Sequence, residues 1–192
     1  MRYPADHKQQ AYARILQAAG SLFRKRGYAA TGIDSVMASA NLTAGAFYAH
    51  FRSKEDLLAK ALDAAFCESR DTWSAQVESQ RGRSWVRNFV SFYLSSEHRD
   101  MPESGCPMPS LAPEIRHIDG TPRTIFERRL RDLVAIVQSK TGLARGHRSR
   151  AISAIALCVG GLMLSRAIKD QGFSDEILDA CRKAVIRDVE HA

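Results

Sequence analysis

The chain has 192 residues, 45% of them apolar and 26% charged, which is ordinary for a soluble globular protein of one or two domains. Its longest apolar run, residues 151–164, is shorter than the roughly 18 residues of a membrane-spanning helix, and the N-terminus lacks the apolar centre of a signal peptide. The formal net charge is +7, and residues 1–60 supply +5 of it through nine basic and four acidic side chains. We therefore expect a cytoplasmic protein without a membrane partner, and a polyanion partner for its N-terminal segment.

Apolar residues recur at helical spacing along almost the whole chain, and no segment alternates as a strand does. The pattern predicts an all-α fold of about nine helices. The expected helices cover residues 8–26, 33–40, 44–50, 54–80, 83–98, 107–117, 122–141, 147–171 and 175–190.

Turn and capping residues separate the first four predicted helices. Gly27 suits the left-handed conformation that ends a helix, and Asn41 tolerates positive φ in a short turn. Thr31 and Thr43 are placed to cap the second and third helices, and residues 53–56 resemble a capping box for the fourth.

The third predicted helix has an unusual outward side. At about 100° per residue, Ala44, Gly45, Tyr48 and Ala49 share one side, whereas Phe47 and its neighbours share the other and anchor the helix. Two short helices joined by a short turn in a basic segment are the sequence form of a helix-turn-helix. Small residues would let the backbone approach base edges in a major groove, where an Ala methyl can meet a thymine methyl.

The remaining polar groups of this region suit phosphate contacts. They are the Thr43 hydroxyl, the Tyr48 hydroxyl, His50, and Lys54 at the start of the next helix. The sequence therefore predicts binding of double-stranded DNA.

Residues 31–58, TGIDSVMASANLTAGAFYAHFRSKEDLL, resemble the DNA-binding segment of the TetR/AcrR family of bacterial repressors, and the resemblance extends over residues 8–62. It implies an all-helical homodimer, with a three-helix DNA-binding domain over residues 1–53 and a variable ligand-binding and dimerisation domain over residues 54–192. Dimerisation is expected through the last two helices. Asn41 and Met37 depart from the usual Gly and Ala of the pattern. The DNA contacts that the resemblance implies fall on Gly32, Thr43, Ala44, Gly45, Tyr48, Ala49, His50 and Lys54.

An effector site is predicted on the middle helices, because ligand sites in helical bundles favour apolar walls with few polar groups. The aromatic residues of these helices are equally compatible with an ordinary core. Cys106, just before Pro107, is either a buried structural thiol or a sensor of electrophiles with a lowered pKa at a helix start. The predicted ligand-binding residues are Phe66, Trp73, Trp85, Phe89, Tyr93, Cys106 and Phe126.

A glycine pair at residues 160–161 lies within the eighth predicted helix, and glycine costs roughly 1 kcal/mol of helix propensity against Ala. Close approach of another helix would explain it. We predict two-fold packing of this helix through Ile155, Val159, Leu162 and Met163.

These features favour a ligand-responsive repressor that binds a palindromic operator as a homodimer and is released by a small-molecule or electrophile effector. The alternatives are a transcriptional activator and a DNA-binding protein without an effector. An enzyme is disfavoured, because the sequence has no nucleophile elbow, phosphate loop or metal triad. The four cysteines are too far apart in sequence for a metal pair, so neither a metal nor a cofactor is expected.

Overall fold

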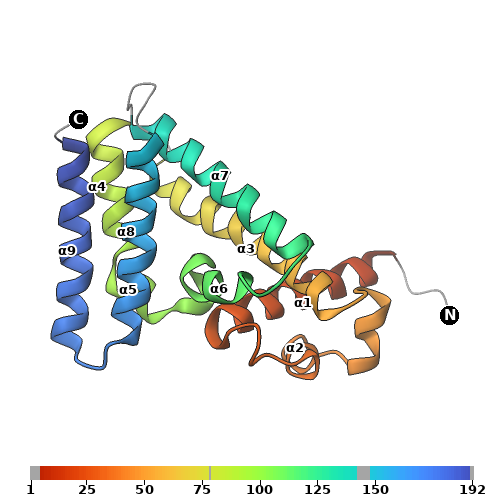
Figure 1. The fold of residues 1–192 in the computed structure, drawn as a ribbon. Helices are drawn as coiled ribbons and strands as arrows, with labels where there is room; N and C mark the ends of the chain where they lie inside the picture. The colour runs from red at the N-terminus through yellow and green to blue at the C-terminus, as the bar shows by residue number, and fades with distance from the viewer. Residues whose placement is uncertain (1–4, 78, 142–147, 191–192) are drawn as a thin grey trace. The chain divides into compact units, whose positions relative to one another are not determined.

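The computed structural model describes residues 5–77, 79–141 and 148–190, and within these ranges every regular element is a helix (Figure 1). The predicted all-α fold is thus confirmed. The α-helices are α1 (Ala5–Arg26), α2 (Ile33–Ser39), α3 (Lys54–Val77), α4 (Gly82–Tyr93), α5 (Ser96–Asp100), α6 (Met108–Ile115), α7 (Thr121–Thr141), α8 (Arg148–Ala167) and α9 (Gln171–Glu190). Two short 3₁₀ helices are η1 (Ala44–Ala49) and η2 (Pro102–Ser104).

Several predicted helices differ from the structure in their bounds. The helix expected over residues 83–98 is two helices, because Ser95 caps a separate α5 by accepting a hydrogen bond from the His98 N–H at 3.1 Å. The last helix begins at Gln171, where the side chain of Asp170 accepts a hydrogen bond from the Phe173 N–H at 2.7 Å. The expected start of the eighth helix at residue 147 lies outside the described residues.

The chain divides into two compact units, which we describe separately. The first unit combines residues 1–68 with residues 102–127, and the second combines residues 69–101 with residues 128–192. The predicted domain boundary after residue 53 stays a prediction.

In the first unit, α1 packs through a stripe of buried residues at helical spacing. Ile15, Ala19 and Phe23 are almost completely buried, as the helical periodicity of this segment predicts. Gly27 then ends the helix with a φ of +84°, which confirms the predicted left-handed conformation. The N–H of Gly27 closes the last turn on the Phe23 carbonyl at 3.0 Å.

The predicted capping role of Thr31 is wrong, since Gly32 is the N-cap of α2. Thr31 is completely buried, and its hydroxyl donates at 2.7 Å to the Gly27 carbonyl. It therefore satisfies a part-buried carbonyl just after α1 rather than an N–H at the start of α2.

Replacing Thr31 with Val should lower the free energy of unfolding by about 1–2 kcal/mol, because the part-buried Gly27 carbonyl loses its donor while the side-chain volume is kept. Urea denaturation measures the change. Thr31→Ser retains the hydroxyl and serves as the control. Equal losses in the two variants would show that the methyl group, and not the hydrogen bond, stabilises this turn.

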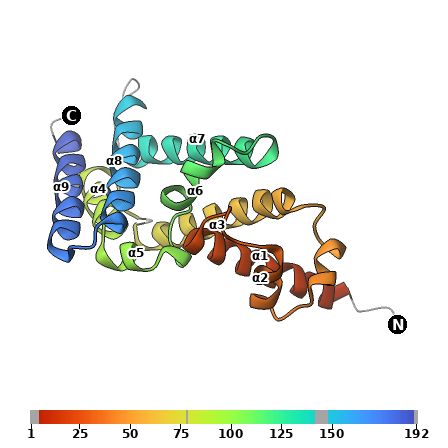
Figure 2. The same cartoon turned by 60° about the horizontal axis from the view of Figure 1, so that its bottom comes forward.

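The second unit contains the α8 and α9 hairpin, in which the two helices lie side by side in both views (Figures 1 and 2). Leu162, Leu178 and Val185 are buried in it. A Cβ added to Gly161 would lie 2.7 Å from the Cys181 Sγ, so the absence of a side chain lets α9 approach closely. The expected close approach is therefore found, at Gly161 and within one chain.

Candidate nucleic-acid interface

The helix-turn-helix of the first unit consists of α2, a short turn and η1. Asn41 in the turn has a φ of +54°, the one positive value at a non-glycine residue in the described ranges, as its position predicts. The Leu42 N–H donates to the Met37 carbonyl at 2.9 Å and so closes α2. Met37 itself is fully buried, so this departure from the family pattern fills the core.

Two phenylalanines anchor η1 and the residues after it, as predicted. Phe47 has no exposed surface, Phe51 is 2% exposed, and their ring centroids lie 5.6 Å apart. Tyr12 of α1 stacks on Phe51 at 5.2 Å. The apolar side of η1 is thus fixed to the first unit.

The opposite side of η1 is exposed. Tyr48 is 73% exposed, and no atom comes within 4 Å of a Cβ added to Gly45. The predicted division into two sides is found, although the segment is a 3₁₀ helix and not the expected α-helix. Its six residues are too few for a stable α-helix without strong caps. The exposed residues on this side are Ala44, Gly45, Tyr48 and Ala49.

Polar groups flank this exposed side. Thr43 occupies the N-cap position of η1, but its side chain makes no capping hydrogen bond, so the predicted cap is not formed. Gly32, at the N-cap of α2, is also exposed and has no atom within 4 Å of an added Cβ. Burial, followed by the charge of Lys8, lowers the pKa of His50, so this half-buried imidazole is neutral at pH 7.

The start of α3 is capped as predicted. The Asp56 N–H donates to the Ser53 hydroxyl at 3.1 Å, and the Asp56 carboxylate accepts from the Arg52 N–H at 3.1 Å. Lys54, a predicted phosphate contact, is engaged within the chain, since its ammonium donates to the Tyr28 carbonyl at 2.7 Å. Its position relative to η1 is therefore held by Tyr28, a residue that the sequence did not single out.

The seven predicted ligand-binding residues are divided between the two compact units. Four of them form a chain of ring contacts in the second unit, with Trp85 stacked on Phe89 at 4.9 Å and Trp73 edge-on to Phe89 at 5.1 Å. Tyr93 continues this chain at 5.7 Å from Phe89. The other three lie in the first unit, where Phe66 and Phe126 meet edge-on at 5.8 Å and Cys106 is buried.

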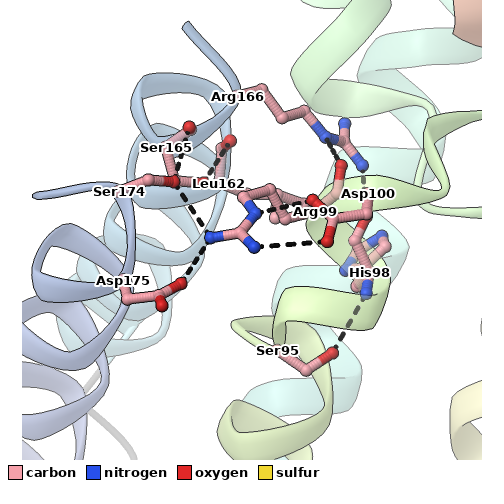
Figure 3. Close-up of polar contacts among 9 residues, drawn as sticks. All are labelled: Ser95, His98, Arg99, Asp100, Leu162, Ser165, Arg166, Ser174 and Asp175. Atoms are coloured by element: carbon pink, nitrogen blue, oxygen red, sulfur yellow. Dashed lines mark hydrogen bonds and ion pairs between the residues drawn. The ribbon is translucent and has the colours of Figure 1, made fainter. Parts of the chain in front are cut away.

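A buried polar network joins α5 to the α8 and α9 hairpin in the second unit (Figure 3). The Arg99 guanidinium is 5% exposed and donates to the Ser174 hydroxyl at 3.0 Å and to Asp175 at 2.5 Å. Arg166 donates to the carbonyls of His98 at 2.6 Å and Arg99 at 3.0 Å, near the C-terminal end of α5. These charge-assisted bonds fix α5 on the hairpin.

The four residues predicted for dimerisation differ in exposure. Ile155 and Leu162 are buried within their own unit, Val159 is half-buried, and Met163 is 42% exposed. By length and apolar composition alone, α8 is the one described helix that could cross a membrane, and 33% of its most apolar window is buried. The large exposed apolar side chains of α8 are Ile152, Leu157, Met163 and Leu164.

The described residues contain no cluster of three or more His, Cys, Asp or Glu side chains placed to hold a metal ion. The first unit instead presents a helix-turn-helix with an exposed second helix, within residues 1–60, whose formal charge is +5. That arrangement defines the class of helix-turn-helix proteins.

Comparison with known proteins identifies the family. Residues 15–61 match the family model for bacterial regulatory proteins of the tetR family. The regulator TtgR of Pseudomonas putida is 34% identical over 80 residues, which are 42% of this chain and 38% of TtgR. A TetR-family regulator from Agrobacterium tumefaciens has a TM-score of 0.80 at 18% identity, covering 95% of this chain and 98% of that one. The helix-turn-helix segment of this chain is therefore that of the tetR family, and the fold of the chain is that of TetR-family regulators.

Reduced NemR of E. coli also shares the fold, with a TM-score of 0.77 at 19% identity over 91% of this chain and 94% of that one. The curated relatives are matched over only 17% to 38% of their own length. The family model itself matches residues 15–61 of this chain. The family is one of transcriptional regulators rather than enzymes.

Proposed function

We propose that the chain is a ligand-responsive transcriptional repressor that binds a palindromic operator as a homodimer in the bacterial cytoplasm. The observation that carries this proposal is the exposed side of η1. It combines small residues and a 73% exposed Tyr48 with a firmly buried Phe47, a combination that a helix serving only the core does not need. A major groove fits such a surface.

The proposed contacts with DNA are of two kinds. Ala44, Gly45 and Ala49 lie against base edges and read shape and thymine methyl groups. The Thr43 and Tyr48 hydroxyls and the Lys54 ammonium contact phosphates, and Gly32 lets the backbone approach the DNA. His50 contributes a neutral N–H and not a charge, because its pKa is lowered.

Selection from a random pool of DNA duplexes with the purified full-length chain tests this function. The proposal predicts enrichment of an inverted repeat whose half-sites are about 10 base pairs apart, centre to centre. A pool that stays random after repeated rounds would contradict it.

The dimer is proposed to form through α8 and α9. Four large apolar side chains of α8 are exposed, and Phe173 at the start of α9 is 51% exposed. Water-exposed apolar surface of this kind marks an interface in a regulator that must contact two half-sites. Leu164, at 53% exposure, contributes more surface to it than the buried Leu162.

Leu164→Arg should therefore give monomers in analytical ultracentrifugation with little change in the fold of each chain. Leu162→Arg is the matched comparison, since it places a charge in the interior and should unfold the hairpin. A Leu164→Arg chain that stays dimeric would remove α8 from the interface.

The effector is proposed to bind among the aromatic residues of the second unit. Trp85 is 1% exposed, and its indole N–H is buried without a hydrogen-bond acceptor in the described structure. An effector with an apolar body and one acceptor group would satisfy that donor. The electrophile alternative depends on Cys106, which is 5% exposed, so alkylation there requires local opening.

A further inference from the structure

A carboxylate of α6 holds the loop between α1 and α2 by its backbone. Glu114 accepts the Tyr28 N–H at 2.9 Å through one oxygen and the Ala29 N–H at 2.7 Å through the other. A Cβ on Gly27 would lie 2.5 Å from the first oxygen. Glycine is therefore required at position 27 for two reasons, the positive φ and the space that the Glu114 carboxylate occupies.

Tyr28 is held from its other side by the first turn of α3. Its carbonyl accepts the Lys54 ammonium at 2.7 Å, and the ammonium lies 4.1 Å from the centre of the Tyr28 ring. Its hydroxyl donates to the Glu55 carboxylate at 3.1 Å. Burial, followed by the hydrogen bond and charge of Glu55, raises the pKa of Tyr28 to about 12, so the hydroxyl keeps its proton.

These contacts form a continuous path within the first unit, from Glu114 through Tyr28 to Lys54. The path also includes the loop that leads into α2, because Ala29 precedes that helix by a few residues. A carboxylate that accepts two backbone N–H groups is sensitive to position, since a shift of α6 along its axis would break both bonds.

We propose that Glu114 is a positioning residue for DNA binding. Through Tyr28 it sets the place of the Lys54 ammonium and of the start of α2, and a displacement of α6 that withdraws the carboxylate weakens operator binding. The proposal rests on the proposed function, because its readout is affinity for the operator. It assigns the coupling between α6 and the helix-turn-helix to one side chain.

Glu114→Gln tests the proposal in the full-length chain. The amide keeps the size of the side chain but offers one acceptor oxygen in place of two. Fluorescence anisotropy with the selected operator should show about a tenfold loss of affinity, comparable to one lost charge-assisted hydrogen bond. Glu103→Gln is the matched control, because Glu103 forms an ion pair between η2 and α1 with the Lys25 ammonium at 3.1 Å and is not hydrogen-bonded to Tyr28. It should change affinity less than about twofold.

Lys54→Met completes a double-mutant cycle with Glu114→Gln. If Glu114 had a merely structural role, the affinity losses of the two variants would add. If Glu114 acts through Lys54, the loss caused by Glu114→Gln should be much smaller in the Lys54→Met chain. Parental affinity in Glu114→Gln would overturn the proposal, and so would an undiminished loss in the double variant.

Backbone amide hydrogen exchange separates this proposal from the proposed function. In the absence of DNA, the Tyr28 and Ala29 amides should exchange faster in Glu114→Gln than in the parent or in Glu103→Gln. Unchanged exchange would overturn the contact path alone. A parent chain with no preference for any operator would overturn the proposed function, and with it the role of Glu114 in DNA binding.

Discussion

A chain carrying Gly45→Glu should bind the operator about 100-fold more weakly than the parent while keeping its thermal stability. Gly45 lies on the exposed side of η1, and an added Cβ meets no atom within 4 Å, so the folded protein accommodates the new side chain. In the complex, the carboxylate would face DNA phosphates and the longer side chain would hold the helix away from the base edges. Anisotropy titrations and thermal melts measure the two effects.

Two further substitutions at the same position separate charge from size. Gly45→Ala adds one methyl group and should change operator affinity by only a few fold. Gly45→Lys should bind scrambled DNA more tightly than the parent, because it adds a phosphate contact without sequence information. If Gly45→Glu binds the operator as the parent does, the DNA-binding surface is not the exposed side of η1.

The second large effect concerns His98 and acid. We expect the free energy of unfolding to fall by about 3 kcal/mol as the pH is lowered from neutral to about 4, through this one residue. Burial lowers the pKa of His98 from 6.5 to about 4, with a smaller contribution in the same direction from the charge of Arg166. The hydrogen bond between its Nδ1 and the Tyr93 carbonyl, 2.7 Å long, opposes this shift only in part.

The direction of the effect follows from proton binding. As the pH falls below 6.5, the unfolded chain takes up a proton on His98, whereas the folded chain does so only near pH 4. Protons therefore favour the unfolded state in this window, and the stability present above pH 6.5 is lost. His50, whose pKa is also lowered, contributes in the same direction.

Urea denaturation of the parent and of His98→Gln across this range isolates the contribution of His98. The amide keeps a donor for the Tyr93 carbonyl and does not titrate. The difference in unfolding free energy between the two chains should shrink as the pH falls toward 4. A difference independent of pH would contradict a buried neutral imidazole at this position.

Local features of the first unit could be predicted from the sequence. The positive φ of Gly27 and Asn41, the capping box at residues 53–56 and the two sides of η1 depend on residues within a few positions of one another. The 3₁₀ form of η1 could not be predicted, because exposure of Tyr48 and burial of Phe47 fit either helix type.

Contacts between distant parts of the chain could not be predicted. From the sequence, Glu114 is expected to be a solvated side chain at the end of a short helix. Only folding brings it to Tyr28, which lies 86 residues earlier. The interface side of α8 was also ambiguous, since apolar residues occur on nearly all sides of that helix. Helical periodicity predicted both Leu162 and Met163 at the dimer interface, whereas Leu162 is buried within its own unit and Met163 is exposed.

The predicted effector residues show a related limit of prediction from helical spacing. Trp73 and Phe66 both lie on α3, yet they belong to different compact units. Helical spacing describes which side of one helix is apolar. It does not tell which other helices cover that side.

The most direct test of DNA binding by this chain is a comparison of two duplexes of equal length and composition, the selected operator and a scrambled copy, by fluorescence anisotropy at fixed salt. We predict that the chain binds the operator at least about a thousandfold more tightly than the scrambled copy. Equal affinity for the two duplexes at every salt concentration would contradict a sequence-specific regulator.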